Sequence, residues 1–453
     1  MQNFEALLDQ LVRIVWGEYV LIPLLALVGI YLSLGLRLVP WRSLGFAIRL
    51  LVQPPKPGAR GEISPFNALM TALSATIGTG NIAGVATAIY FGGAGALFWM
   101  WVIALVGMAT KYSEALLAVK YRQVDRAGQY VGGPMYYIKN GLGIHWKWLA
   151  SAFALFGMIA AFGIGNMVQS NSVADVLLST YAIPAPATGL AIALLAGVVI
   201  IGGVRRIAEV AGRLVPLMAV AYLGAAVTIL ILKADAVPSA FATIFDSALN
   251  GSTATDGFLG ATVWAAIRWG CARGIFSNEA GLGSAAIAHG AAKTNNAVHQ
   301  GMVAMLGTFI DTIIMCTLTG LVIITTGAWL SGDQGATMSA LAFSSVLGEA
   351  GRHVVSLGLA IFAFTTIIGW SYYGERCAAY LLGTSVIPFY RIAWVVAILL
   401  GAVFKLNLVW AFADLFNGLM ALPNLVALLL LSPVIFSETR NYMHNRKQSQ
   451  PAV

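Results

Sequence analysis

Apolar runs of about 20 residues recur along the whole chain, separated by short loops. An α-helix rises about 1.5 Å per residue, so about 20 residues cross the roughly 30 Å hydrocarbon core of a bilayer. Backbone groups in lipid must be hydrogen-bonded within the protein, and a helix meets this requirement by itself. Only 10% of the residues are charged, whereas about a quarter are charged in soluble domains. The pattern therefore predicts an all-α polytopic membrane protein.

We expect about 11 transmembrane helices within a single membrane domain, residues 1–453. The predicted spans cover about residues 15–36, 64–91, 94–119, 147–179, 187–203, 207–232, 257–290, 297–327, 353–384, 386–404 and 408–432. Between the first two spans, Trp41, Phe46 and Ile48 alternate with Arg42 and Arg49. This pattern suits a helix on the membrane surface, and a plain basic loop is the alternative.

Lysine and arginine are divided unevenly between the loops. Assigning alternate loops to opposite sides places twenty of the 26 on one side and four on the other, and two lie within the seventh span. Because cytoplasmic loops hold the excess of these residues, we expect a multi-pass cell-membrane protein with its N-terminus outside. Its C-terminal tail, residues 433–453, is then cytoplasmic. This orientation explains the net charge of +8 without a nucleic-acid partner, since no basic stripe with interleaved aromatic residues is present.

The second span is interrupted at 74–85, where the sequence SATIGTGNIAGV places three glycines in an apolar run. Each glycine inside a helix costs roughly 1 kcal/mol relative to alanine. Non-helical backbone at membrane depth is tolerated where it lines a cavity or is buried in protein. A break in the helix is therefore expected here. The alternative is close helix packing through Gly80 and Gly84, a pair of small residues spaced four apart.

The seventh span is interrupted in the same way at 269–284, where the sequence is WGCARGIFSNEAGLGS. It lies five spans after the second span, so the two interrupted spans cross the membrane in opposite directions. Two such spans in corresponding positions are typical of an inverted repeat with a substrate site at the midplane. The repeats would be residues 64–232 and 257–432, and 15–36 would be an extra N-terminal helix.

Three motifs of the chain are specific in combination. They read ATIGTGNIAGVAT at 75–87, GGPMYYI at 132–138 and SNEAGLGSAAIAH at 277–289. Together they resemble the alanine or glycine:cation symporter family, the sodium:alanine symporters, over nearly the whole chain. The resemblance implies a leucine-transporter-type fold with a five-plus-five inverted repeat and one extra N-terminal helix. It also implies import of alanine or glycine by alternating access, with sodium as the coupling ion and no cofactor.

A small zwitterion needs hydrogen-bond donors for its carboxylate and acceptors for its ammonium group. The N–H groups of Thr79, Gly80 and Asn81 are expected to open the second half of the broken second span, where the helix dipole favours an anion. Unpaired carbonyls and side-chain oxygens of the seventh span are expected to accept the ammonium; the residues are Arg273, Gly274, Phe276, Ser277 and Asn278. The alternative for Ser277 and Asn278 is capping of the next half-helix, with Glu279 in its first turn.

Span four places Phe162, Asn166 and Gln169 at positions i, i+4 and i+7, which form one face of a helix. Amides are costly against lipid, so this face is expected to point inward, with Gln169 as a ligand contact. Trp370, which follows Gly369 in span nine, is a candidate lid that limits the size of the substrate side chain. Phe162 is the second candidate wall. Ordinary packing is the alternative for Trp370. For the face of span four, the alternative is that its residues only tie helices together.

Thr365 and Thr366 lie in the middle of span nine. By resemblance to the fold, they match an adjacent hydroxyl pair that binds sodium with carbonyls of the first broken helix, here around Ala75 and Gly78. Taken from the residues alone, threonines in a helix more often bond back to their own backbone.

Charged residues inside the predicted spans are costly unless they are paired or solvated. Asp311, near the centre of span eight, is therefore a functional candidate, and Arg268 and Arg273 are its possible partners. Lys111 and Glu114 are expected near the cytoplasmic interface, in gating or anchoring.

Other classes of function leave no matching motif. The five histidines form no H-E-x-x-H, no G-x-x-x-x-G-K-[ST] is present, and the cysteines Cys271, Cys316 and Cys377 fall in different spans. We therefore expect no enzyme activity, structural metal, disulfide or ATP coupling. The open alternatives are a carrier for another small solute and an ion channel, because glycine-rich breaks also build filters. Two inverted breaks without a repeated filter motif favour a carrier, and no pattern indicates an oligomeric state.

Overall fold

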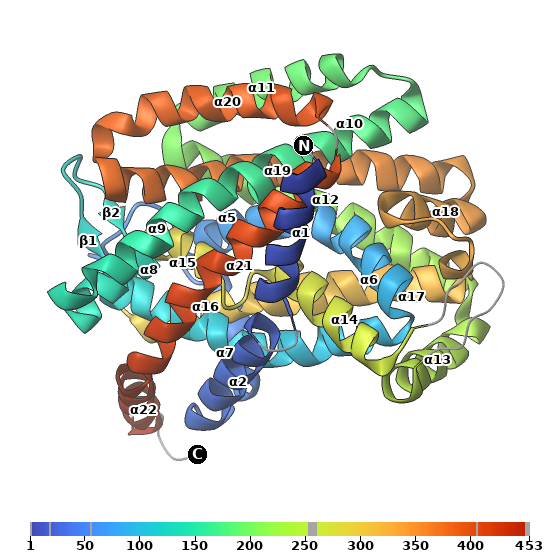
Figure 1. The fold of residues 1–453 in the computed structure, drawn as a ribbon. Helices are drawn as coiled ribbons and strands as arrows, with labels where there is room; N and C mark the ends of the chain where they lie inside the picture. The colour runs from blue at the N-terminus through green and yellow to red at the C-terminus, as the bar shows by residue number, and fades with distance from the viewer. Residues whose placement is uncertain (1, 18–19, 55–56, 252–260, 405, 449–453) are drawn as a thin grey trace.

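Helices account for nearly all of the regular structure in the computed structural model of the chain (Figure 1), which describes residues 2–17, 20–54, 57–251, 261–404 and 406–448. In chain order the helices of the first half are α1 (Gln2–Val15), α2 (Leu21–Gly35), α3 (Val39–Arg42), α4 (Leu44–Val52), α5 (Pro65–Thr76), α6 (Val85–Gly92), α7 (Gly95–Lys120), α8 (Pro134–Tyr137), α9 (Lys147–Phe162), α10 (Val168–Tyr181), α11 (Ala185–Ile201) and α12 (Gly203–Leu232). A small antiparallel hairpin of β1 (Gln123–Val124) and β2 (Tyr130–Val131) follows α7.

The second half continues with α13 (Val237–Asn250), α14 (Val263–Asn278), α15 (Ser284–Gly290), α16 (Ala297–Thr308), α17 (Thr317–Thr325), α18 (Gly335–Leu347), α19 (Glu349–Leu382), α20 (Ile387–Val403), α21 (Leu406–Leu430) and α22 (Ser432–Gln448). Short π-helical segments, at Gly80–Gly84, Ile138–Leu142, Gly163–Met167 and Phe309–Cys316, interrupt or extend the α-helices. Single 3₁₀ turns lie at Ile144–Trp146, Ala234–Ala236, Ala328–Leu330 and Thr384–Val386.

Seven of the described helices are long and apolar enough to cross a membrane. An eighth span results when the bent pair Pro65–Thr76 and Gly80–Gly92 is counted as one. Their bounds lie within a few residues of the predicted ones, for example Gly95–Lys120 against the predicted 94–119. The count of eleven and the inverted repeat remain predictions. Residues 18–19, 257–260 and 449–453 of the predicted spans and tail lie outside the described residues.

Several helices outside the predicted spans were not expected from the apolar runs. They include α1, α13, α18 and α22. Helix α13 packs against α7 through aromatic rings. The Phe245 ring lies 5.7 Å from that of Phe98 and 6.2 Å from that of Trp101. The segment predicted to form a surface helix or a basic loop is helical, as α4, and its Ile48 side chain is 51% exposed.

Glycines let the long helices approach one another closely. A Cβ atom at Gly270 of α14 would lie 2.4 Å from the carbonyl oxygen of Ala96 in α7, so no larger residue fits there. A Cβ atom at Gly274, one turn later, would lie 3.0 Å from Ile103 of the same helix. Small residues at a helix crossing bring the backbones together, as in other membrane bundles. Two glycines of the predicted second break therefore serve packing within a regular helix.

Polar side chains are fully buried where the two interrupted spans meet α7 and the segment around Asp311. Asn81, Glu114 and Asp311 are each 0% exposed, and Lys111 is 2% exposed. Such groups are retained in a membrane protein where they pair with one another or line a functional site. This buried polar region is the candidate functional site.

Candidate functional site

The first break lies where it was predicted. Helix α5 ends at Thr76, the helix resumes at Gly80, and the two halves are bent by 53°. The side-chain oxygen of Asn81 accepts a hydrogen bond of 3.0 Å from the N–H of Gly78. Thr79, Gly80 and Asn81 thus stand at the start of the second half, where the first N–H groups of a helix have no partner within it.

The second break lies later than predicted. Helix α14 continues through Arg273, Gly274 and Phe276 to Asn278, and α15 begins at Ser284. Carbonyls at Arg273 and Gly274 lie inside this helix, so the expectation that they are unpaired is wrong. The physical reason is that the positive φ angles needed to leave the helix occur further on. They are found at Glu279, Gly281 and Gly283.

The carbonyls at the end of α14 remain acceptors for a ligand or for other helices. Phe276, Ser277 and Asn278 lie among its last residues, whose carbonyls have no partner within a helix. One of them, the carbonyl of Asn278, accepts a 2.7 Å hydrogen bond from the Lys111 ammonium. The Asn278 side chain accepts from the N–H of Ala280 within the break. Neither Ser277 nor Asn278 caps α15, because residue Gly283 occupies the position before its first turn.

Lys111 and Glu114 of α7 hold the backbone of the second break. One Glu114 oxygen accepts hydrogen bonds from the N–H groups of Gly281 and Gly283, at 3.0 and 3.1 Å, and from the Asn424 amide at 2.7 Å. Both side chains are buried and bind the backbone of the break, a contact that the sequence did not predict. Their place near the cytoplasmic interface, in gating or anchoring, stays a prediction. Buried backbone groups at a break need partners, and residues three apart on one face of α7 supply them.

Trp370 of α19 also reaches the second break. Its indole N–H donates a 2.8 Å hydrogen bond to one carboxylate oxygen of Glu279, and Ser284 donates to the other at 2.5 Å. A Cβ atom at Gly165 in span four would lie 2.1 Å from the Trp370 Cβ, so this glycine makes room for the tryptophan. The structure therefore places Trp370 between the second break and span four.

Asp311 joins the two interrupted spans. Its carboxylate accepts hydrogen bonds of 2.8 Å each from the Asn81 amide of the first, the Ser277 hydroxyl of the second and the hydroxyl of Thr312. The amide of Asn278 in turn donates to the Thr312 hydroxyl at 3.0 Å. Charge-assisted hydrogen bonds of this kind are roughly twice as strong as neutral ones. One carboxylate therefore fixes the two breaks relative to each other.

The arginines expected to pair with Asp311 have other partners. The Arg273 guanidinium forms a 2.8 Å ion pair with Asp414 and lies over the rings of Trp269, Phe276 and Trp410, at 5.7, 5.1 and 5.5 Å. The Arg268 guanidinium also lies over the Trp269 ring, at 5.7 Å. The proposed pairing is wrong, and Asp414 was missed because no local pattern links residues 141 positions apart.

The two breaks touch at a glycine. A Cβ atom at Gly80 would lie 3.0 Å from the Cα and 3.1 Å from the Cβ of Ser277. At Gly84 the nearest atom to such a Cβ is 3.8 Å away, in ordinary contact. Of the predicted small-residue pair, only Gly80 is therefore a point of close approach. That approach joins the two interrupted spans.

The three residues predicted on one face of span four point to different neighbours. The ring of Phe162 packs on Tyr390 and Trp394 of α20, at 5.2 and 5.3 Å, and the Asn166 amide donates to the Trp394 carbonyl. Phe162 is therefore not brought to the breaks. Gln169, in contrast, lies at the first break, because its side-chain oxygen is 3.3 Å from the position of a Cβ added at Gly78. The π-helical turn at Gly163–Met167 explains why Phe162 and Gln169 face different neighbours. Its hydrogen bonds join residues five apart, so the residues after it are rotated relative to a regular α-helix.

The threonine pair in α19 lies beside the first break. The Thr366 hydroxyl stands 3.4 Å from the carbonyl oxygen of Ile77 and 3.1 Å from that of Phe362. The Thr365 hydroxyl donates to the Phe362 carbonyl at 2.8 Å. A Cβ at Gly369 would lie 3.0 Å from the backbone nitrogen of Ala75, so α19 packs tightly on the first half-helix. Both threonines bond back to their own helix, and Thr366 also reaches the broken span.

Beside the first break, buried oxygens of Thr79 and Gln169 have no hydrogen-bond partner among the described residues. They are the hydroxyl oxygen of Thr79 and the side-chain oxygen of Gln169. Both residues are at most 2% exposed. Buried polar groups are almost always paired in folded proteins. Unpaired acceptors beside two helix breaks are therefore suited to a small polar ligand.

Comparison with other proteins places the chain in a known group. The family model described as the sodium:alanine symporter family matches residues 1–453. The chain is 49% identical to the sodium/alanine symporter AgcS of Methanococcus maripaludis, over 98% of both chains. It is 36% identical to the probable sodium/glutamine symporter GlnT of Bacillus subtilis, over 97% of this chain and 91% of that one.

A solved structure shows the same kind of fold. MhsT, crystallised in complex with L-phenylalanine, superposes with a TM-score of 0.58 at 14% identity, over 83% of this chain and 90% of that one. MhsT has the leucine-transporter fold, as the sequence motifs implied for this chain. The resemblance read from those motifs is confirmed, and the chain is a multi-pass membrane transporter and not an enzyme. The chain belongs to the sodium:alanine symporter family.

Proposed function

We propose that this protein imports alanine or glycine together with sodium, and that the substrate binds between the two helix breaks. The observation that carries the proposal is the contact of Gly80 with Ser277, which brings the open ends of two half-helices together. Family membership makes the chain a sodium-coupled amino-acid transporter. The choice of alanine or glycine follows the family name and the crowding around the breaks.

The substrate carboxylate would face the N–H groups that open the second half of the first broken span. Thr79, Gly80 and Asn81 stand there, and the N-terminal end of a helix carries partial positive charge. Deep burial strengthens the interaction, because little water screens it. The unpaired Thr79 hydroxyl adds a hydrogen-bond donor at the same place.

The substrate ammonium would face acceptors on the other side. The carbonyls of Phe276 and Ser277 end α14, and the Gln169 side-chain oxygen is buried and unpaired. An ammonium group has three donors and no acceptor, which matches this set. Trp370, held by Glu279, would limit the size of the side chain that fits.

Sodium would bind between the first broken span and α19. The Thr366 hydroxyl and the Ile77 carbonyl lie 3.4 Å apart, and the carbonyls of Ala75 and Gly78 flank them along the chain. Hydroxyl and carbonyl oxygens suit a hard cation, and carbonyls freed by a broken helix are a recurrent source of them. Thr365 would contribute less to this site, because its hydroxyl bonds only to the Phe362 carbonyl among the described residues, whereas the Thr366 hydroxyl also reaches Ile77 of the broken span.

Alternating access in this proposal is a motion of the helices that carry the breaks against α9, α10 and α19. We also propose the eleven-span inverted repeat, an external N-terminus and a cytoplasmic C-terminus. A C-terminal tag that protease removes only from outside intact cells would contradict this orientation.

The test uses the purified full chain in proteoliposomes with labelled alanine. Uptake should saturate with alanine, require sodium, exceed the external alanine concentration when an inward sodium gradient is imposed, and be inhibited by unlabelled glycine more strongly than by leucine. Uptake that does not saturate with alanine would favour the ion-channel alternative. Saturable alanine uptake that does not depend on sodium would contradict the coupling of alanine transport to sodium.

A further inference from the structure

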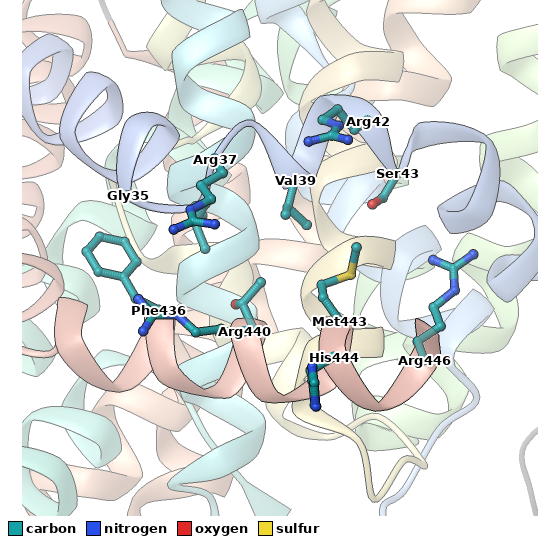
Figure 2. A pocket seen from close by; sticks show the side chains of 12 residues that line it. Gly35, Arg37, Val39, Arg42, Ser43, Phe436, Arg440, Met443, His444 and Arg446 are labelled. Atoms are coloured by element: carbon teal, nitrogen blue, oxygen red, sulfur yellow. The ribbon is translucent and has the colours of Figure 1, made fainter. Parts of the chain in front are cut away.

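A cavity of about 430 Å³ lies away from the breaks, between the α2–α4 segment and the C-terminal helix α22. Figure 2 shows the residues of α22 across from those of the α2–α4 segment. Arg37 and Arg42 stand on one wall, and Arg440 and Arg446 on the other. None of the described residues that line the cavity is Asp or Glu. The cavity is therefore strongly basic and suits an anion.

Three of the four arginines are available to a ligand. Arg37, Arg42 and Arg440 are exposed, and none of them forms an ion pair within the described part of the chain. Arg446 is held at the rim, with its guanidinium 3.6 Å from the centre of the Phe46 ring. Like charges gathered without an acidic partner repel one another, and a bound anion would remove this repulsion.

Beside the residues that line the cavity, the α2–α4 segment carries exposed apolar side chains. Leu34 is 67% exposed, Leu38 47%, Trp41 37% and Ile48 51%. The cavity begins at Gly35, where the apolar helix α2 ends, and lies along α22, which follows the membrane helix α21. Arginines at the end of apolar helices, beside exposed apolar side chains, are arranged as a lipid headgroup and its acyl chains require.

We propose that this cavity binds the headgroup phosphate of an anionic phospholipid. The planar guanidinium groups of Arg37, Arg42 and Arg440 would bind the phosphate oxygens through paired N–H donors. The acyl chains would lie against Leu34 and Trp41. A free phosphate ion would bind the arginines but would leave Leu34 and Trp41, which flank the cavity residues in the sequence, without a partner, so these apolar side chains favour the lipid. The bound lipid would bridge α22 and the α2–α4 segment, in addition to contacts such as that of Arg446 with the Phe46 ring.

The experiment measures binding of a fluorescent phosphatidylglycerol to the purified full chain in neutral detergent micelles. The test variant replaces Arg37, Arg42 and Arg440 by glutamine. Binding should weaken about fivefold for each arginine removed, which is on the order of 100-fold for all three. The matched control replaces three other exposed basic residues by glutamine: Arg126, Lys147 and Arg206. It should weaken binding less than about threefold.

Two further arms identify the ligand. Phosphatidylcholine with the same acyl chains should compete poorly, and inorganic phosphate should not displace the lipid at equal concentration. Equal weakening in the two triple variants would overturn the proposal in favour of diffuse attraction. Displacement by inorganic phosphate at the lipid's own concentration would overturn the lipid as ligand. If the triple variant does not fold, Arg440→Gln alone should weaken binding about fivefold, and unchanged binding would overturn the proposal.

Discussion

Replacing Gly80 by alanine tests whether contact between the two breaks matters for function. The new Cβ would lie 3.0, 3.1 and 3.2 Å from three atoms of Ser277, which is closer than carbon atoms normally pack. Ser277 can move little, because its hydroxyl is bonded to the buried Asp311 carboxylate. The two half-helices must therefore separate by a few tenths of an ångström.

The expected cost follows from the packing. Adding a methyl group to a well-packed core typically costs about 1–3 kcal/mol. Strain of this size in the substrate-binding arrangement would raise the alanine concentration for half-maximal uptake about 5- to 150-fold. Gly84→Ala is the matched control, because it lies on the same half-helix and its Cβ would meet its nearest atom at 3.8 Å. Removing this glycine should even stabilise the helix, by up to about 1 kcal/mol.

The assay is labelled alanine uptake into proteoliposomes, with thermal melting of each purified variant as a check of folding. Gly80→Ala should impair uptake while Gly84→Ala leaves it within about twofold of the parent protein. Equal effects of the two variants would refute the reasoning, because both glycines would then act as a simple packing pair. Normal uptake by Gly80→Ala would show that the breaks need no contact.

Three further substitutions test single contacts of the site. Thr366→Val should raise the sodium concentration for half-maximal uptake by about tenfold, because losing a hydrogen-bonding partner of a charged group costs about 1.5–3 kcal/mol. Thr365→Val should raise it much less. The same sodium dependence of uptake in both variants would contradict this assignment. Trp370→Leu should widen acceptance toward valine and leucine in competition assays while weakening alanine binding, and an unchanged profile would assign the tryptophan to packing. Glu114→Gln should lower the free energy of unfolding by about 1.5–3 kcal/mol. Glu438→Gln removes a half-exposed ion pair with Lys120 and should change that free energy by less than about 1 kcal/mol. Equal losses in thermal melts of the two variants would contradict a stabilising role for Glu114 at the break.

Much of the site was predictable because glycine and polar residues stand out in apolar runs. Thr79, Gly80 and Asn81 begin a half-helix as predicted, and Gln169 faces the first break. The reading of the seventh span was less accurate. There, Gly274 and Gly281 look alike in sequence, and only the neighbouring helix decides which of them packs and which turns the chain.

The contacts that the sequence did not predict join residues far apart in the chain. Lys111 and Glu114 are three residues apart in a long helix, and their burial follows from the break that packs on them. Asp311 was found as a costly buried charge, but its partners come from two other spans. Phe162 was placed at the site by a regular helical period that the π-helical turn interrupts.

The central claim is that alanine and sodium move together through a site made by the two breaks. The most direct test loads proteoliposomes with equal sodium on both sides and imposes only an inward gradient of alanine. The account predicts that labelled sodium then accumulates inside, with a dependence on alanine that saturates, and that Gly80→Ala reduces this flux while Gly84→Ala does not. Sodium movement that is unaffected by alanine, or alanine movement without sodium, would contradict the account.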